Sequence, residues 1–311
     1  MEKKLRHIEI CKLLGGCGYN LSLALHEFTN NKPGPILGLS ATIHGDQNLP
    51  IEILRQFSLE LEKIDFKGKV LILPVANPPA LSAYTFKNPI DMSNLNRVFP
   101  GSEKGTLSEK IANAVVKEYI PQADYFIDLH AGGAFATVEY TIIGVNSEEL
   151  AKMMGQRYLY AGGFHPNSMT FYINQKNKQA AICELGGGGK NNKYYIQQGV
   201  KGIKNVMKHL KMINGEPELP KKQYCFKELV RIKAKHGGIF KPNLSIESMH
   251  KVFKKDYLLG TTYSPYTFEE IENFYGTFEN NIIILLRADI CRIESGETVI
   301  QIANMDTVKL I

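Results

Sequence analysis

The stretch PILGLSATIHGDQNLPIEILRQF, residues 35 to 57, decides the fold of the first two thirds of the chain. Its first nine residues are apolar or small, which predicts a strand buried on both faces. Apolar residues then recur at helical spacing, so we expect an amphipathic helix over 51–64. The polar segment His44 to Gln47 lies between the two. A strand, a polar turn and a helix in this order are typical of an α/β sheet.

The same alternation continues to about residue 215. Further strands are expected at 69–77, 123–130, 139–144 and 180–186, and further helices at 107–120, 147–159 and 194–213. Short apolar strands that alternate with amphipathic helices predict a largely parallel sheet with helices on both sides.

The pattern of apolar and polar residues changes after residues 214–222, NGEPELPKK, a polar segment with two prolines. Residues 223–311 hold short β-type runs separated by turn residues, and only 267–276 shows helical spacing. We therefore expect two domains: an α/β domain over residues 1–215 and a small, mainly β domain over residues 220–311.

The composition limits the class of protein. A chain of 311 residues with 44% hydrophobic and 22% charged residues can bury a large core. No apolar run approaches the roughly 20 residues of a membrane span, and the N-terminus lacks the apolar segment of a signal peptide, so we expect a cytoplasmic protein without a membrane partner. The net charge of +6 comes from dispersed lysines, which argues against nucleic acid. A homo-oligomer is compatible with the sequence.

The five cysteines form no C-x-x-C pair and are odd in number. The sequence therefore suggests neither a disulfide framework nor a cysteine zinc site. Packed, reduced thiols are the expected state of these side chains, including Cys17.

Polar side chains follow several of the predicted strands, where functional groups of open α/β sheets collect. His44, His130 and Glu184 come at strand ends, and the segment after residue 77 contains Asn96 and Arg97. Each feature on its own could have a purely structural role. A histidine could be held by hydrogen bonds, Glu184 could cap a helix, and the four glycines 186–189 could form a tight turn. Two histidines, an oxygen donor three residues after the first, a glutamate and an Asn-Arg pair together predict a hydrolytic zinc site with one open position.

The segments HGDQ (44–47), SNLNRVFPG (93–101), DLHAGG (128–133) and ELGGGG (184–189), in this order, resemble the succinylglutamate desuccinylase and aspartoacylase family, a branch of the zinc carboxypeptidase superfamily. Residues 199–215 look like the family's last core helix, and 236–242 look like the opening of its C-terminal β domain. The resemblance thus covers nearly the whole chain. It implies a three-layer α/β/α zinc-carboxypeptidase-like domain with a mostly parallel or mixed sheet, followed by the small β domain.

The resemblance also implies one zinc ion per chain and a role for each motif residue. The implied zinc ligands are His44, Gln47 and His130, the catalytic base is Glu184, and Asn96 and Arg97 bind a substrate carboxylate. An arginine fork suits a carboxylate better than lysine does. Asp128, two residues before His130, could orient that ring; its structural reading is a buried acid held by backbone amides.

Two positions depart from the family pattern. Gln47 stands where the family has a glutamate ligand, and a neutral amide oxygen is a poorer donor to zinc than a carboxylate. Asp46 is an alternative oxygen donor. Phe86 aligns with an arginine that can steady the oxyanion in relatives, and Lys87 beside it could supply the charge.

The implied reaction is hydrolysis of the amide bond in a small N-acyl amino acid or a related carboxylate-bearing amide, hence an anionic substrate. Two alternatives stay open: a catalytically impaired relative that only binds its ligand, and a zinc carboxypeptidase that acts on peptides. The sequence does not choose the acyl group. Nor does it choose a pocket donor among Tyr140, Tyr158, Tyr160, Tyr172 and His165.

Overall fold

The computed structural model of the protein describes residues 1–12, 20–188 and 192–311. Cys17 and Gly189, named above, lie outside the described residues. Within them, a ten-stranded sheet runs in the order β1 (Glu2–Cys11), β2 (Leu21–Thr29), β4 (Lys69–Leu73), β3 (Ile36–Ala41), β5 (Tyr125–His130), β9 (Gln179–Glu184), β7 (Tyr140–Ile143), β8 (Tyr158–Tyr160), β10 (Tyr224–Phe226) and β19 (Lys309–Leu310). Strands β4, β3, β5 and β9 are parallel, whereas β2 and β7 join them antiparallel. The sheet is therefore mixed, with a parallel centre.

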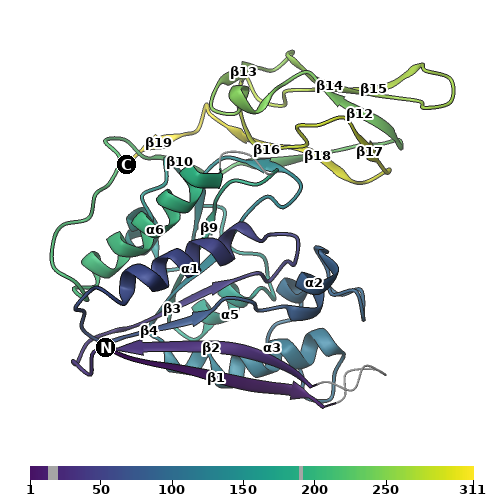
Figure 1. Ribbon diagram of the computed structural model, residues 1–311. Coiled ribbons are helices and arrows are strands. Elements are labelled where there is room, and N and C mark those ends of the chain that lie inside the picture. Colours follow the sequence, from purple (N-terminus) through teal and green to yellow (C-terminus); the bar gives the residue numbers. More distant parts are fainter. Residues whose placement is uncertain (13–19, 189–191) are drawn as a thin grey trace.

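Helices cover both faces of this sheet. One face carries α1 (Leu49–Leu61), α4 (Glu148–Met153) and α6 (Asn192–His209), and the other carries α3 (Leu107–Glu118) and α5 (Met169–Gln175). Shorter helices, α2 (Pro78–Ala83), η2 (Leu95–Arg97) and η3 (Ile120–Gln122), lie in the connections. Figure 1 shows α1 and α6 side by side across the sheet. Among the described residues, no helix is long and apolar enough to cross a membrane.

Strand β4 shows why three layers form. Its side chains alternate between faces, as in any strand. Val70 and Ile72 pack into the apolar cluster under α1 and α6, whereas Leu71 and Leu73 pack into the cluster under α3. An uninterrupted apolar strand is thus buried from both sides, which confirms the expected α/β/α architecture.

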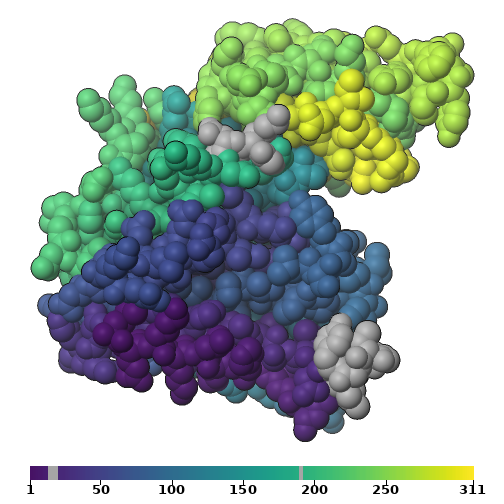
Figure 2. Space-filling model, viewed as in Figure 1, coloured from purple at the N-terminus to yellow at the C-terminus, as the bar shows by residue number. Residues whose placement is uncertain are grey.

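The C-terminal part adds two antiparallel sheets. The first contains β11 (Leu229–Lys233), β18 (Thr298–Asn304), β16 (Asn280–Leu286) and β13 (Val252–Lys254), and β6 (Ala136–Thr137) pairs with β16. The second contains β15 (Glu270–Tyr275), β14 (Leu258–Tyr263), β12 (Gly238–Pro242) and β17 (Cys291–Ile293), and η4 (Ile246–Ser248) lies between strands. The space-filling view shows this part standing over the rest, with an indentation between the two (Figure 2). The additional β region is confirmed.

The division at residues 215 and 220 stays a prediction. Strands β10 and β19 come from the C-terminal third of the chain but extend the large sheet beyond β8. In the opposite direction, β6 comes from the loop after His130 but pairs with β16 of the C-terminal sheet. The two parts are thus joined by strand pairing in both directions.

Two expected helices differ from the structure. The helix over 147–159 ends at Met153 because Gly155 adopts a positive φ of 72°, and residues 158–160 form β8, whose Tyr158 and Leu159 are buried. Residues 270–275 form β15 instead of a helix, since Phe274 packs into the core while the hairpin with β14 satisfies the backbone. No sequence motif predicted the antiparallel pairing of β1 and β2 at the edge of the sheet.

Candidate active site

Three neighbouring parallel strands bring the predicted site residues to one edge of the sheet. His44 follows the end of β3 by three residues, His130 is the last residue of β5, and Glu184 is the last residue of β9. His130 and Glu184 are direct cross-strand partners. Because the carboxyl ends of parallel strands meet at the same edge, residues far apart in sequence gather there.

The imidazoles of His44 and His130 lie next to each other, with ring centroids 5.4 Å apart and planes inclined by 68°. The Nδ1 of His44 lies 3.0 Å from the carbonyl oxygen of Phe86, which can only accept, so Nδ1 carries the proton. The Nε2 of His130 donates to Asp128 Oδ2 at 2.9 Å, and Asp128 also accepts from Ser40 Oγ at 2.7 Å. Each ring is therefore oriented by one nitrogen, which leaves the other nitrogen for a ligand.

The two histidines differ in their electrostatics. Burial and, next, the neighbouring His130 hold the pKa of His44 well below its ordinary value. Burial also opposes charge on His130, but the charge and hydrogen bond of Asp128, with a contribution from Glu184, outweigh it and raise the pKa of His130. A neutral His44 keeps the lone pair that metal binding requires.

The carboxylate of Glu184 faces His130. Its Oε1 lies 4.0 Å from His130 Nδ1, and its side chain is 16% exposed. Burial raises the pKa of Glu184 to about 7, although His130 acts in the opposite direction. A carboxylate that titrates near neutral pH is suited to act as a general base.

Tyr140 stands beside Glu184 on the other side from His130. The two residues are antiparallel cross-strand partners on β7 and β9. Burial and then the charge of Glu184 raise the pKa of Tyr140 well above its ordinary value, so the phenol keeps its proton. Of the five pocket-donor candidates in the sequence, Tyr140 is the one placed against Glu184 by strand register.

The third predicted metal donor is a neutral side chain. Gln47 is buried, and its Oε1 accepts a hydrogen bond from the backbone nitrogen of Ala131 at 3.2 Å. Asp46 packs against Gly133, where a Cβ would lie 2.6 Å from its Oδ2, and Asp46 Oδ1 is buried without a hydrogen-bond partner among the described residues. Within the described chain, no group of three His, Cys, Asp or Glu side chains could hold a metal ion. Two oriented imidazoles and a neutral amide oxygen are the donors that the described chain offers zinc here, and zinc binding stays a prediction.

The Asn-Arg pair lies in η2, on the loop that follows α2. Asn96 accepts from the backbone nitrogen of Met169 through Oδ1 at 2.9 Å, so its amide nitrogen is the donor left for a ligand. Arg97 donates from Nη1 to the carbonyl oxygen of Asn96 at 2.7 Å. Burial and, next, the charge of Arg231 lower the pKa of Arg97. No carboxylate pairs with Arg97 in the part of the chain that is described, so its guanidinium is available to an anion.

Phe86 and Lys87 occupy different surroundings. The Phe86 ring stacks on His44 at 3.8 Å between centroids, with planes inclined by 9°, while its carbonyl holds the same imidazole. Lys87 is exposed, and its carbonyl oxygen accepts from Thr85 Oγ1. No hydrogen bond or ion pair joins the Lys87 side chain to another described residue. A substrate role for Lys87 stays a prediction.

Arg231, on β11, is a site neighbour that the sequence analysis missed. Its positive charge partly offsets the rise in pKa that burial causes at Glu184 and at Tyr140. Arg231 therefore acts on the same group of side chains. The sequence held no signal for it, because its position depends on how the C-terminal sheet packs against the loop after His130.

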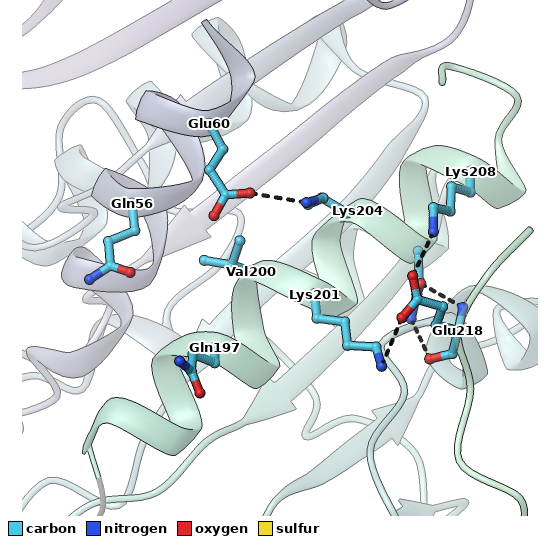
Figure 3. A pocket seen from close by; sticks show the side chains of 9 residues that line it. Gln56, Glu60, Gln197, Val200, Lys201, Lys204, Lys208 and Glu218 are labelled. Atoms are coloured by element: carbon cyan, nitrogen blue, oxygen red, sulfur yellow. Dashed lines mark hydrogen bonds and ion pairs between the residues drawn. The ribbon is translucent and has the colours of Figure 1, made fainter. Parts of the chain in front are cut away.

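A separate cavity of about 290 Å³ lies between α1 and α6, away from the strand ends (Figure 3). Its lysines are matched by carboxylates: Lys204 pairs with Glu60 at 3.0 Å, and Lys201 and Lys208 each pair with Glu218 at 3.2 Å. None of the motif residues lines it. Paired charges leave little attraction for a charged ligand, so we place the candidate site at the histidines.

Residues 33–210 match the model of the succinylglutamate desuccinylase/aspartoacylase catalytic domain. The chain belongs to this family. It is 28% identical over 229 residues to the N-alpha-acetyl-L-2,4-diaminobutyric acid deacetylase of Halomonas elongata, a match that covers 68% of this chain and 67% of that enzyme. A second match, 32% identical over 106 residues, is to the succinylglutamate desuccinylase of Shewanella denitrificans and covers 32% of this chain and 29% of that enzyme, less than a third of its length.

Solved structures of family members share the fold. The succinylglutamate desuccinylase/aspartoacylase from Rhodobacter sphaeroides superposes with a TM-score of 0.84 at 21% identity, covering 97% of this chain and 95% of that one. The product-bound ectoine utilization protein EutE (DoeB) from Ruegeria pomeroyi gives 0.84 at 22% identity, with 97% and 95% covered. Both parts of the present chain are therefore included in the common fold.

Proposed function

We propose that this protein hydrolyses the amide bond of a small N-acyl amino acid or a related carboxylate-bearing amide. One observation carries the proposal: the carboxylate of Glu184, with its pKa raised to about 7, stands 4.0 Å from Nδ1 of His130, the ring nitrogen that Asp128 does not hold. Near neutral pH such a group can accept a proton from water and return it to a leaving amine. The deacetylase and desuccinylase relatives support the same class of reaction.

We infer that one zinc ion binds to His44 and His130, with the amide oxygen of Gln47 as the third ligand. Zinc, when bound, supplies Lewis acidity: it polarises an acyl carbonyl and makes water more acidic. The hydrogen bonds of His44 to Phe86 and of His130 to Asp128 support this assignment, since metal-binding histidines usually donate their second nitrogen to such a partner.

Side chains of the protein bind the substrate and transfer the proton. Arg97 and Asn96 bind the substrate carboxylate and hold the scissile amide in place. Glu184 takes a proton from the attacking water as the new C–O bond forms, and the same proton goes to the nitrogen as the C–N bond breaks. The products are a free carboxylic acid and an amine.

The C-terminal β region supports a preference for small substrates. The loop after His130 enters this region as β6 and continues into β7, and Val138 and Tyr140 share an apolar core with Phe240 and Ile283. The β sheets therefore stand beside the candidate site, where they would restrict long peptides. A cytoplasmic location and a small anionic substrate are parts of the same proposal.

The test is a panel of N-acyl amino acids and short peptides offered to zinc-loaded protein, with release of free amine as the readout. Turnover of single acyl amino acids that is lost in Glu184→Gln, with zinc retained, supports the deacylase. Peptide cleavage without activity on acyl amino acids supports a carboxypeptidase instead. Ligands that raise the melting temperature without any amine release support a binding protein. The control is Glu216→Gln, an exposed glutamate outside the site, which should keep full activity.

A further inference from the structure

The ring of Phe86 covers one face of the His44 imidazole and leaves its own other face open. The two ring centroids are 3.8 Å apart and the planes are inclined by 9°, so the rings stack face to face. Despite this contact, Phe86 is 44% exposed. A large apolar ring in contact with a histidine of the candidate site therefore meets solvent on its other side, and covering that side with an apolar group would be favourable.

The backbone around Phe86 is fixed against the histidine. The carbonyl oxygen of Phe86 accepts from His44 Nδ1 at 3.0 Å. The carbonyl oxygen of Thr85 accepts from the backbone nitrogen of Gly45 at 2.9 Å, and a Cβ on Gly45 would lie 1.9 Å from the backbone of Ala80 in α2. The exposed ring is thus held in one place, so a ligand does not have to order it on binding.

The loop that carries Phe86 exposes further large apolar side chains. These are Tyr84 (63% exposed), Ile90 (56%) and Met92 (68%). The loop is nevertheless fixed from inside: Asn88 is completely buried, its backbone nitrogen donates to the carbonyl oxygen of Ser93 at 2.9 Å, and its Nδ2 donates to Ser108 Oγ at 3.1 Å. Exposed apolar side chains on a loop held by buried hydrogen bonds are typical of a binding surface.

The candidate site indicates which part of a substrate meets the Phe86 ring. In the proposed reaction the substrate carboxylate binds to Arg97, and the acyl carbonyl lies at the metal held by His44 and His130. The acyl chain extends from this carbonyl on the side opposite to the amine half. Because Phe86 is in direct contact with His44, its ring is an exposed apolar surface beside a proposed metal ligand.

Lys87, the next residue, offers the opposite chemistry. Its side chain is exposed and would attract an acyl chain that ends in a carboxylate. Salt and water screen an exposed charge, whereas they do not weaken the gain from covering an apolar ring. The contacts of Phe86 therefore favour an apolar acyl chain over an acidic one at this place.

We propose that Phe86 is a specificity-determining residue whose open face binds an apolar acyl chain of the substrate. This inference rests on the proposed function and extends it, because it names the acyl group. The preferred substrates are then amino acids that carry an aliphatic acyl chain longer than acetyl.

The experiment compares three substrates that differ only in the acyl group: N-acetyl-L-alanine, N-(4-methylpentanoyl)-L-alanine and N-succinyl-L-alanine. The second and third have nearly the same shape, but only the third carries a charge on the acyl chain. Burial of one methylene group is worth about fourfold in binding, so zinc-loaded native protein should prefer the 4-methylpentanoyl over the acetyl compound by about tenfold or more in kcat/KM. It should also prefer it over the succinyl compound.

Variants of Phe86 then test the assignment. Phe86→Ser keeps the backbone carbonyl that holds His44 but should bring the ratio of 4-methylpentanoyl to acetyl activity to within about threefold of one, mainly through a higher KM for the longer chain. Phe86→Leu should restore most of the ratio. The matched control is Phe268→Ser, an exposed phenylalanine in the turn between β14 and β15 at the outer end of the C-terminal part (Figure 1), which should leave the ratio within about twofold of native.

Two results overturn the inference. If Phe86→Ser loses the same factor on all three compounds, the ring only positions His44. If native protein prefers the succinyl compound and Lys87→Gln removes that preference, the charge of Lys87 selects the acyl group instead.

A direct binding measurement separates the inference from the proposed function. If none of the amides is hydrolysed, tighter calorimetric binding of the 4-methylpentanoyl than of the acetyl compound, lost in Phe86→Ser and kept in Phe268→Ser, still supports the apolar subsite. If amides are hydrolysed but neither the ratio nor binding depends on Phe86, the inference fails and the deacylase stands.

Discussion

Replacing Glu184 by glutamine should stabilise the metal-free protein at alkaline pH far more than at acidic pH. In the folded protein burial raises the pKa of Glu184 from 4.5 to about 7. A group whose folded pKa lies above its unfolded value contributes its stability below the unfolded pKa and loses it as pH rises through the folded pKa. The native protein therefore loses stability between about pH 4.5 and pH 7, and glutamine cannot ionise.

The size of the effect follows from the shift. The raised pKa of Glu184 lowers the unfolding free energy of the native protein by about 3.4 kcal/mol at pH 8. At pH 5 the same effect lowers it by about 0.8 kcal/mol. The difference in unfolding free energy between Glu184→Gln and the native protein should accordingly grow by about 2.5 kcal/mol from pH 5 to pH 8. Urea unfolding in the presence of a chelator at the two pH values measures it.

The control is again Glu216→Gln, whose unfolding free energy should stay within about 0.5 kcal/mol of the native value at both pH values. A Glu184→Gln difference of the same size at pH 5 and pH 8 would refute the reasoning, because it would mean that the carboxylate titrates alike in the folded and unfolded chains. The site would then not be buried as described.

Three further changes test the site and the core. Gln47→Glu should tighten zinc binding by about tenfold or more, since a carboxylate attracts the ion more strongly than a neutral amide does; competition with a chelator measures it, and unchanged affinity would remove Gln47 from the ligand set. Asp128→Asn should weaken zinc binding by about 10- to 100-fold through loss of the carboxylate that orients His130, and an affinity equal to native would contradict that role. Phe57→Ala should lower the unfolding free energy by about 3–5 kcal/mol, because Phe57 is fully buried on the inner face of α1. The exposed Leu59→Ala should change it by about 0.5 kcal/mol or less, and equal losses would contradict the packing.

The parallel centre of the sheet and the residues at its edge were predictable from the sequence. Strands such as β3 and β5 are nearly continuous apolar runs, and a polar residue directly after such a run stands at the functional edge of an α/β sheet. His44, His130 and Glu184 were identified in this way. The motifs then gave the family, which the match over residues 33–210 confirms.

The remaining features depend on contacts between distant segments. Residues 158–160 and 270–275 form strands because partners elsewhere in the chain pair with them, and such partners leave no trace in local spacing. The stacking of Phe86 on His44 depends on the course of the loop after α2. The position of Arg231 depends on the register of β11, β18, β16 and β6, which no local pattern in the sequence predicts.

The exchange of strands between the two parts of the chain limits where the protein can be divided into fragments. A fragment ending near residue 215 would lack β10, the neighbour of β8, and would expose Val138, Tyr140 and Tyr158 to water. Such truncations should aggregate rather than yield a working minimal enzyme. Chimeras that graft another C-terminal region should for the same reason carry residues 136–140 along with it, so that the pairing of β6 with β16 stays native.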